Sequence, residues 1–124
     1  MSVPVEIERL REQITASGPA VFLISVRDGE RPHVVSADVR WDGDRLVAEV
    51  GGRTASNATE HSAITLLWPA AGQDYSLLVD GTATVEGSTL SMEPTSAVLH
   101  RSVLASPPDG HHDGDDPRCM PVLG

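Results

Sequence analysis

Residues 20–50 read AVFLISVRDGERPHVVSADVRWDGDRLVAEV, and this stretch decides the fold. It begins with a continuous apolar run, residues 20–26, as in a strand that is covered on both faces. In residues 33–41 apolar and polar side chains alternate, and this period of two is typical of a half-buried strand. Residues 46–50 are again mostly apolar. The stretch therefore predicts three consecutive β-strands.

Two Asp-Gly pairs, Asp28-Gly29 and Asp42-Gly43, separate these strands, and Asp-Gly is a strong signal for a tight hairpin turn. The three strands are therefore expected to form an antiparallel meander. Gly81 lies inside a later strand pattern and predicts a bulge or bend there. Around the meander, the patterns predict a helix at 4–17, a short polar-faced helix at 53–60, strands at 63–68, 75–85 and 89–92, and either a strand end or a short helix at 95–101. Six short antiparallel strands predict a mainly β domain that closes, or nearly closes, into a barrel, because closure removes exposed strand edges.

The chain has 124 residues, enough for one domain, and carries a net charge of −9 with nine arginines and no lysine. Such an acidic chain is a poor candidate for binding nucleic acid or an anionic membrane surface. No apolar run approaches the ~18 residues of a membrane span, and residues 1–6 have neither the basic nor the apolar region of a secretory signal. Because the single Cys119 cannot form an intramolecular disulfide, we expect a cytoplasmic protein.

The composition changes near residue 105, so we expect a barrel domain over residues 1–104 and an acidic tail over residues 105–124. The tail contains His111, His112 and Cys119, whose imidazole and thiol groups can ligate a transition metal. Adjacent histidines point in different directions in most backbone conformations, and a Gly- and Asp-rich stretch separates them from the cysteine. The sequence therefore predicts a solvated tail without a metal site and leaves the role of the tail open.

The barrel core is expected to be thin, because the chain has one Phe, one Tyr and two Trp, and its apolar mass is mostly Val, Leu and Ala. A small sheet core of this kind gains apolar burial by dimerisation.

Gly51 and Gly52 stand between the third strand and the helix that follows, and Arg53, Thr54 and Ser56 come next. Glycines let the backbone approach a ligand closely, and a helix start presents unpaired N–H groups to an anion. An arginine fork and hydroxyl donors add to such a site. The segment therefore predicts a phosphate cradle, the alternative being an ordinary loop with Thr54 as helix N-cap and Arg53 in solvent. No pattern in the chain points to a particular catalytic residue.

The order of these elements resembles the FMN-binding split β-barrel family, which includes pyridoxamine 5′-phosphate oxidase and small actinobacterial flavin or deazaflavin reductases. The resemblance covers about residues 5–101. It is carried by RPHVVSA at 31–37, by the Gly52-Arg53-Thr54-x-x-Asn57 motif, and by the strand patterns at 63–68 and 75–83. It implies a six-stranded split barrel that forms an obligate homodimer, with a flavin in a groove at the dimer interface.

The resemblance also implies site residues by position. For the flavin phosphate and ribityl chain these are Arg53, Thr54, Ser56 and Asn57. For the isoalloxazine ring they are Val35, Ser36 and Ala37, with Trp68, or Trp41, at the border of the pocket. Family members often carry Lys or Arg where this chain has Ser56, so one phosphate cation fewer is expected.

The function that the resemblance implies is FMN-dependent hydride transfer to or from a small molecule. The tail lacks the C-terminal Arg-x-His pattern of the pyridoxamine oxidases, so their activity is not expected. Two alternatives stay open: a deazaflavin-dependent reductase, and a non-catalytic barrel that acts as a flavin or haem carrier or as a dimer without cofactor.

Overall fold

The computed structural model of the chain describes residues 2–27, 29–70 and 75–101. In these residues it contains eight strands, two α-helices and one 3-10 turn. In chain order they are β1 Ser2–Val5, η1 Ile7–Arg9, α1 Leu10–Ser17, β2 Val21–Ser25, β3 His33–Ala37, β4 Arg40–Asp42, β5 Arg45–Glu49, α2 Gly52–Glu60, β6 Ala63–Trp68, β7 Ser76–Glu86 and β8 Thr89–His100. No helix in the described ranges is long and apolar enough to cross a membrane.

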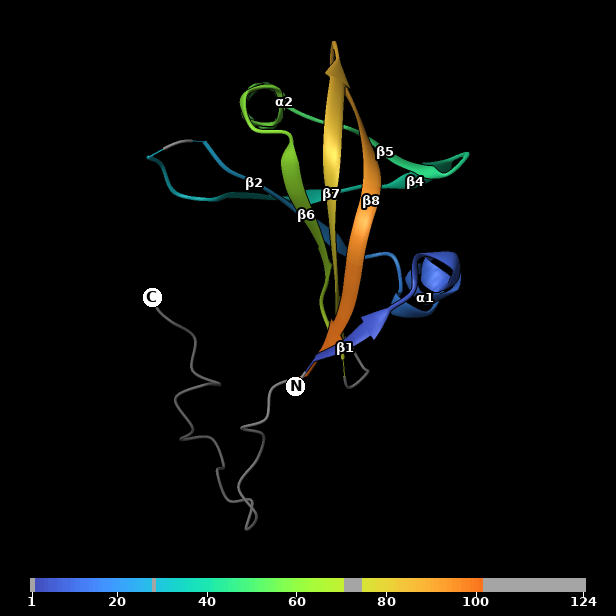
Figure 1. Cartoon of the computed structure of the whole chain (residues 1–124). Helices are drawn as coiled ribbons and strands as arrows, with labels where there is room; N and C mark the ends of the chain where they lie inside the picture. Colours follow the sequence, from blue (N-terminus) through green and yellow to red (C-terminus); the bar gives the residue numbers. More distant parts are fainter. Residues whose placement is uncertain (1, 28, 71–74, 102–124) are drawn as a thin grey trace, which may run out of the picture.

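The strands form one antiparallel sheet in the order β3-β2-β6-β7-β8-β5-β4, with β1 added to β8. The two ends of this order, β3 and β4, are consecutive in the chain and separated only by Asp38 and Val39. Figure 1 shows this segment crossing behind β6, β7 and β8, from β2 on one side to β5 on the other. The sheet must therefore curl until its ends meet, which confirms the predicted mainly β barrel with two short helices.

One edge of β8 changes partner along its length, whereas its other edge stays paired with β7 throughout. Its first part pairs with β5, from Glu49↔Thr89 to Leu46↔Met92, and its last part pairs with β1, from Val5↔Ala97 to Ser2↔His100. Residues 93–96 lie between these two ladders. The chain leaves the sheet there, from β1 into η1 and α1.

The core fills the inside of the curled sheet with side chains from alternate strand positions. In β2, Val21, Leu23 and Ser25 are buried, whereas Phe22 is exposed and Ile24 half-buried, as the period of two requires. The other large buried side chains come from α1 and from the remaining long strands: Leu10, Leu46, Leu66, Trp68, Leu77, Val79, Leu90 and Met92. The core is thus rich in Leu and Val, as the composition predicted.

Gly81 produces the predicted bulge. The register of β7 on β8 shifts between Asp80 and Gly81, so that Gly81 pairs with Pro94 and Asp80 with Ser96. Thr95 is the extra residue, and its Oγ1 donates to the Asp80 carbonyl at 3.1 Å. Because a bulge interrupts the ladder, it accommodates a proline that has no N–H to donate.

Three sequence predictions of secondary structure were wrong or incomplete. Residues 4–17 do not form one helix: residues up to Val5 are paired in β1, and α1 begins only at Leu10. The strand predicted at 33–41 is two strands, because its halves pair with different partners, β2 and β5. For residues 95–101, where a strand end or a short helix was expected, the strand alternative is right, because β8 continues up to His100. These differences turn the six predicted strands into eight, and the predicted tail, residues 105–124, lies outside the described residues.

Candidate functional site

A pocket of about 350 Å³ opens in the seam between β3 and the end of β5. The pairing of β4 with β5 ends at Arg40↔Val47, and beyond this point β3 and β5 are not joined by a ladder in the described sheet. The lining residues are His33, Val35, Ser36 and Ala37 on one side and Glu49, Val50, Gly51, Gly52, Arg53 and Thr54 on the other. We call this the seam pocket. It brings the predicted ring-binding strand and the predicted phosphate cradle together, although they are separated in the sequence.

The first turn of α2 presents unpaired backbone donors to the seam pocket. Its N-cap is Gly51, which has extended backbone and offers no side-chain cap. The first backbone bond of the helix is from Ala55 N–H to the Gly51 carbonyl, at 3.0 Å. The N–H groups of Gly52, Arg53 and Thr54 therefore have no partner within the helix. Thr54 lies inside this turn and is 2% exposed, so the alternative in which it caps the helix is wrong.

Neither glycine at this turn is required by the fold itself. The φ of Gly51 is −78°, and Gly52 is not among the described glycines with positive φ. A Cβ built on either residue meets no atom within 4 Å outside the neighbouring residues and the backbone of the helix itself. The turn therefore leaves open space directly at its backbone donors, which is the geometry that an anion needs in order to approach them.

The opposite side of the seam pocket is more apolar. Val35 and Ala37 on β3 are half-buried and pack against the core, and Val50 does the same at the end of β5. The Glu49 carboxylate also lines the pocket, but it already accepts hydrogen bonds from Ser88 Oγ at 3.1 Å and Thr89 Oγ1 at 2.9 Å. The pocket thus has an apolar wall and a donor-rich end, a common arrangement in small-molecule sites.

Arg27 places a guanidinium at Ser56, where the sequence indicated one cation fewer, and this guanidinium is ion-paired with Glu60. Its Nη2 donates to Ser56 Oγ at 2.7 Å and to Glu60 Oε2 at 3.1 Å. Its Nε is buried and has no partner among the described residues. Because residues three apart share a helix face, Ser56 places this guanidinium one turn beyond Arg53. Sequence reasoning missed Arg27, because it follows β2 and is far from α2 in the chain.

The structure does not bring three other predicted residues to the seam pocket. Asn57 is 4% exposed and donates from Nδ2 to the buried Ser25 Oγ at 3.2 Å, so it ties α2 to β2. Trp68 is 2% exposed and belongs to the core. Trp41 packs against the core and lies beneath the Arg11 guanidinium, 4.3 Å from its ring centre. A buried indole or amide usually forms its hydrogen bonds within the protein rather than with a ligand. No spacing in the sequence indicates which of the two partners it has.

A second cavity of about 460 Å³ adjoins the seam pocket. It is lined by Gly29, Glu30, Arg31, Pro32, His33 and Arg53, and we call it the loop cavity. His33 and Arg53 line both spaces, so the two lie side by side at the start of α2. The sequence interpretation left His33 and Arg31 out of the site residues. The signal that could have found them is the crowding of arginines around the β2–β3 turn, with Arg27 before it and Arg31 within it.

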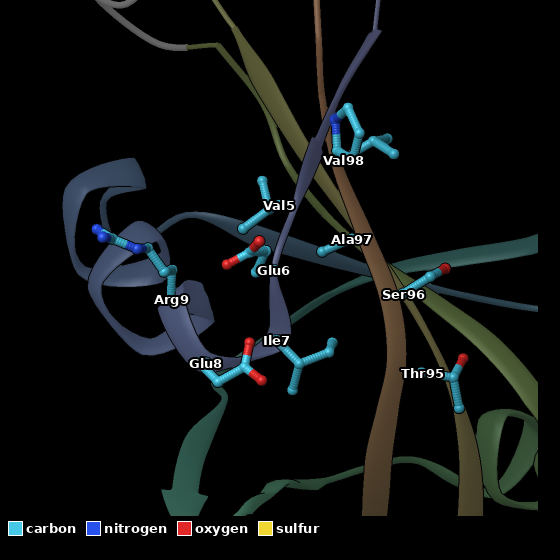
Figure 2. A pocket seen from close by; sticks show the side chains of 10 residues that line it. Val5, Glu6, Ile7, Glu8, Arg9, Thr95, Ser96, Ala97 and Val98 are labelled. Atoms are coloured by element: carbon cyan, nitrogen blue, oxygen red, sulfur yellow. The ribbon is translucent and has the colours of Figure 1, made fainter.

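A larger groove, of about 670 Å³, lies elsewhere in the described part of the chain, between the β1–η1 segment and β8. Figure 2 shows Glu6, Glu8 and Arg9 on the helical side, while Thr95 and Ser96 lie along β8 on the other. Its polar side chains do not converge on one point, and two of the three charged ones are carboxylates. This groove is therefore a poor site for an anionic ligand.

Comparisons with known proteins identify relatives by sequence and by fold. No family model matches the chain. An uncharacterized protein from Mycobacterium bovis is 34% identical over 122 residues, which cover 84% of this chain and 85% of that protein. A solved FAD-binding protein from Mesorhizobium loti superposes with a TM-score of 0.62 at 14% identity, covering 80% of this chain and 96% of that one. A solved candidate pyridoxamine 5′-phosphate oxidase from Listeria innocua gives 0.59 at 16% identity, covering 75% and 99%.

The chain therefore has the split β-barrel fold of the solved pyridoxamine 5′-phosphate oxidase-like and FAD-binding proteins, as the sequence resemblance implied. Within that class, the chain belongs to the same family as the mycobacterial protein.

Proposed function

We propose that the chain binds a flavin in the seam pocket and acts as an FMN-dependent oxidoreductase on a small molecule. The observation that carries this proposal is the meeting of the apolar β3 wall with the uncapped first turn of α2 across one pocket. The name of the Mesorhizobium loti protein with this fold records FAD binding, which supports a flavin over other phosphate-bearing ligands. A bound flavin would supply hydride-transfer chemistry through its ring.

The residues of this chain would hold the two ends of the ligand. The N–H groups of Gly52, Arg53 and Thr54 and the Arg53 guanidinium would bind the phosphate, since charge-assisted donors at a helix start suit that group. Val35, with Ser36 and Ala37 around it on β3, would line the ring. Ser56 would act indirectly, by holding Arg27 beside the same helix face.

We also propose a homodimer, formed through the outer face of the sheet. Facing residues on neighbouring strands share one side of a sheet, and the pairs Ile24↔Val34, Phe22↔Leu67 and Leu67↔Leu78 are apolar on the outside. We call these five residues the outer stripe. Phe22 is 36% exposed and Val34 is 53% exposed, so the stripe offers apolar area to a second copy. A stable dimer buries on the order of 1,200 Å² or more, which requires a contiguous patch of this kind.

Titration of the purified protein with riboflavin, FMN and a deazaflavin tests the flavin proposal. Arg53→Ala should weaken FMN binding by about 10- to 100-fold, the scale of a lost charge-assisted hydrogen bond of about 1.5–3 kcal/mol. Riboflavin lacks the phosphate, so its affinity should change by less than about threefold. Arg40→Ala, an exposed arginine on β4 outside the pocket, is the matched control.

A protein that binds none of these compounds would overturn the flavin proposal and leave a non-catalytic barrel. Binding of the deazaflavin with no binding of FMN would replace the cofactor and keep the site. Equal losses for FMN in Arg53→Ala and Arg40→Ala would remove Arg53 from the site.

A further inference from the structure

The groove between the β1–η1 segment and β8 adjoins a gap in the pairing of β8 (Figure 2). On this edge β8 is paired with β5 as far as Met92 and with β1 from Ala97 onward. No strand in the described residues pairs with residues 93–96 on this edge, and Thr95 and Ser96 are exposed and line the groove. An unpaired strand edge presents backbone N–H and C=O groups that can pair with another extended segment.

The other wall of the groove offers apolar side chains. Ile7 is 44% exposed, and Figure 2 shows its side chain directed from the helical side toward β8. Val5 and Val98 are half-buried and continue the apolar lining at the β1 end. A groove of about 670 Å³ that combines an apolar wall with a free strand edge suits a short extended peptide with apolar side chains.

The chain itself contains a segment of this kind after β8. Residues 102–124 lie outside the described residues, and their sequence holds two apolar stretches, 103–105 and 119–123. The first extends only about 14 Å from Arg101, whereas the gap begins at Ser96, about 17 Å back along β8, so this stretch cannot reach the groove. The second follows a connection of about 18 residues, which spans up to about 60 Å, and therefore reaches it.

The charges of the groove also match the second apolar stretch. Glu6 and Glu8 line the groove, and the arginine that lines it, Arg9, is ion-paired with Glu12 at 3.7 Å. The second stretch follows Arg118 directly and contains no carboxylate, whereas the acidic residues of the tail all precede it. Because the groove charges are exposed, they orient the segment and contribute little to its affinity.

We propose that residues 119–123 dock in this groove of their own chain as an extended segment and cover the open edge of β8. Met120 precedes a proline, a position that favours extended backbone. Because the segment and the groove belong to one chain, the segment is present at an effective concentration on the order of millimolar, which favours it over the same segment of a second copy. The covered edge is protected from pairing with other chains. This docking does not depend on the proposed flavin site.

The single native cysteine, Cys119, allows the docking to be measured by disulfide trapping in the full chain. Ile7→Cys places a thiol in the groove. Val3→Cys is the matched control, because Val3 is 40% exposed, is not part of the groove lining, and pairs with Leu99 near the start of the tail. A tail without a docking site would react at least as fast with this nearer control. A docked tail should link to Ile7→Cys at least about tenfold faster under mild oxidation.

Three further changes in the trapping variant test the contacts. Val122→Asp should slow the link to the rate of the control, because a charge is costly to bury against an apolar wall. Val103→Asp, the same change in the stretch that cannot reach the groove, should leave the rate unchanged. Glu8→Arg should slow the link about two- to fivefold, the scale of an exposed ion pair, and adding Arg118→Glu should restore it.

The outcomes decide both the docking and its occupant. Trapping that is equally fast or faster in Val3→Cys, in proteins whose Tm values are unchanged, would overturn the docking. So would fast trapping in Ile7→Cys that Val122→Asp does not slow. A link within one chain, seen as a 13.1 kDa species on a non-reducing gel, is the expected result. A link that joins two chains would overturn docking within one chain and assign the groove to the tail of a second copy.

Discussion

Replacing Gly52 with alanine is expected to separate the stability of the fold from the affinity of the seam pocket. Gly52 is the first residue of α2 and has no positive φ, and a Cβ built on it meets no atom within 4 Å outside its chain neighbours and the backbone of its own helix. Alanine therefore meets neither a steric nor a backbone penalty in the folded chain. Since it also reduces the conformational freedom of the unfolded chain, we expect the free energy of unfolding to rise by about 0.4–1 kcal/mol.

The same methyl group should impair binding of a phosphate. It would narrow the approach of a phosphate to the first turn of α2, where the N–H groups of Gly52, Arg53 and Thr54 have no partner within the helix. If one charge-assisted hydrogen bond to the phosphate is lost, the cost is about 1.5–3 kcal/mol, which weakens FMN binding by about 10- to 100-fold. Riboflavin, without the phosphate, should bind with nearly unchanged affinity.

Thermal unfolding and flavin titration of the same preparation check both halves of this prediction. The expected result is a Tm that is unchanged or a few degrees higher, together with a weaker FMN complex. A variant that is equally stable and binds FMN as tightly as the wild type would refute the cradle at α2. A variant with a clearly lower Tm would show that Gly52 serves the fold, against the geometry described above.

Three further predictions concern the scaffold. Gly81→Ala should destabilise the protein by about 1–3 kcal/mol in denaturant unfolding, because its Cβ would lie 2.5 Å from a backbone carbonyl oxygen of β8; an unchanged midpoint would contradict this. Asn57→Ala should lower the free energy of unfolding by about 1–3 kcal/mol, because it leaves the buried Ser25 hydroxyl unpaired. The folded fraction should keep its affinity for FMN. A selective loss of FMN binding would show that Asn57 belongs to the site. Val34→Glu places a charge in the outer stripe and should convert the dimer into a 13.1 kDa monomer in light scattering. Ile7→Glu, a control at an exposed apolar residue outside the stripe, should leave the dimer intact. A wild-type protein that is itself monomeric would refute the dimer.

The fold was predictable from the sequence wherever the chain itself sets the local geometry. The Asp42-Gly43 turn joins β4 to β5, and Gly43 has the positive φ that such a turn needs. The bulge at Gly81 and the short helix before His61 also lie where the sequence placed them. What the sequence could not indicate is the exchange of partners along a strand. The alternation in residues 33–41 is the same whether they pair with one strand or, as they do, with two.

The candidate site was predictable only in its backbone. The Gly-Gly-Arg-Thr segment correctly marked the start of α2, because glycines and hydroxyl residues act through local conformation. Side chains such as Asn57 and Trp68 were assigned by position, but their direction depends on the neighbours that the fold provides. Asn57 faces Ser25 on β2, which is 32 residues away in the chain. Long-range choices of this kind have no counterpart in spacing or composition.

Net charge alone does not decide whether this chain can bind an anionic ligand. A total of −9 argues against partners with extended anionic surfaces, because they interact with much of the protein at once. A single phosphate interacts only with the charges near it, because charges more than about 8–10 Å away are largely screened at physiological salt. The local environment decides instead, and three of the nine arginines, Arg27, Arg31 and Arg53, lie around α2 and the loop that faces it. An acidic protein can therefore bind an anionic cofactor, provided that its few cations are gathered where the backbone already offers donors.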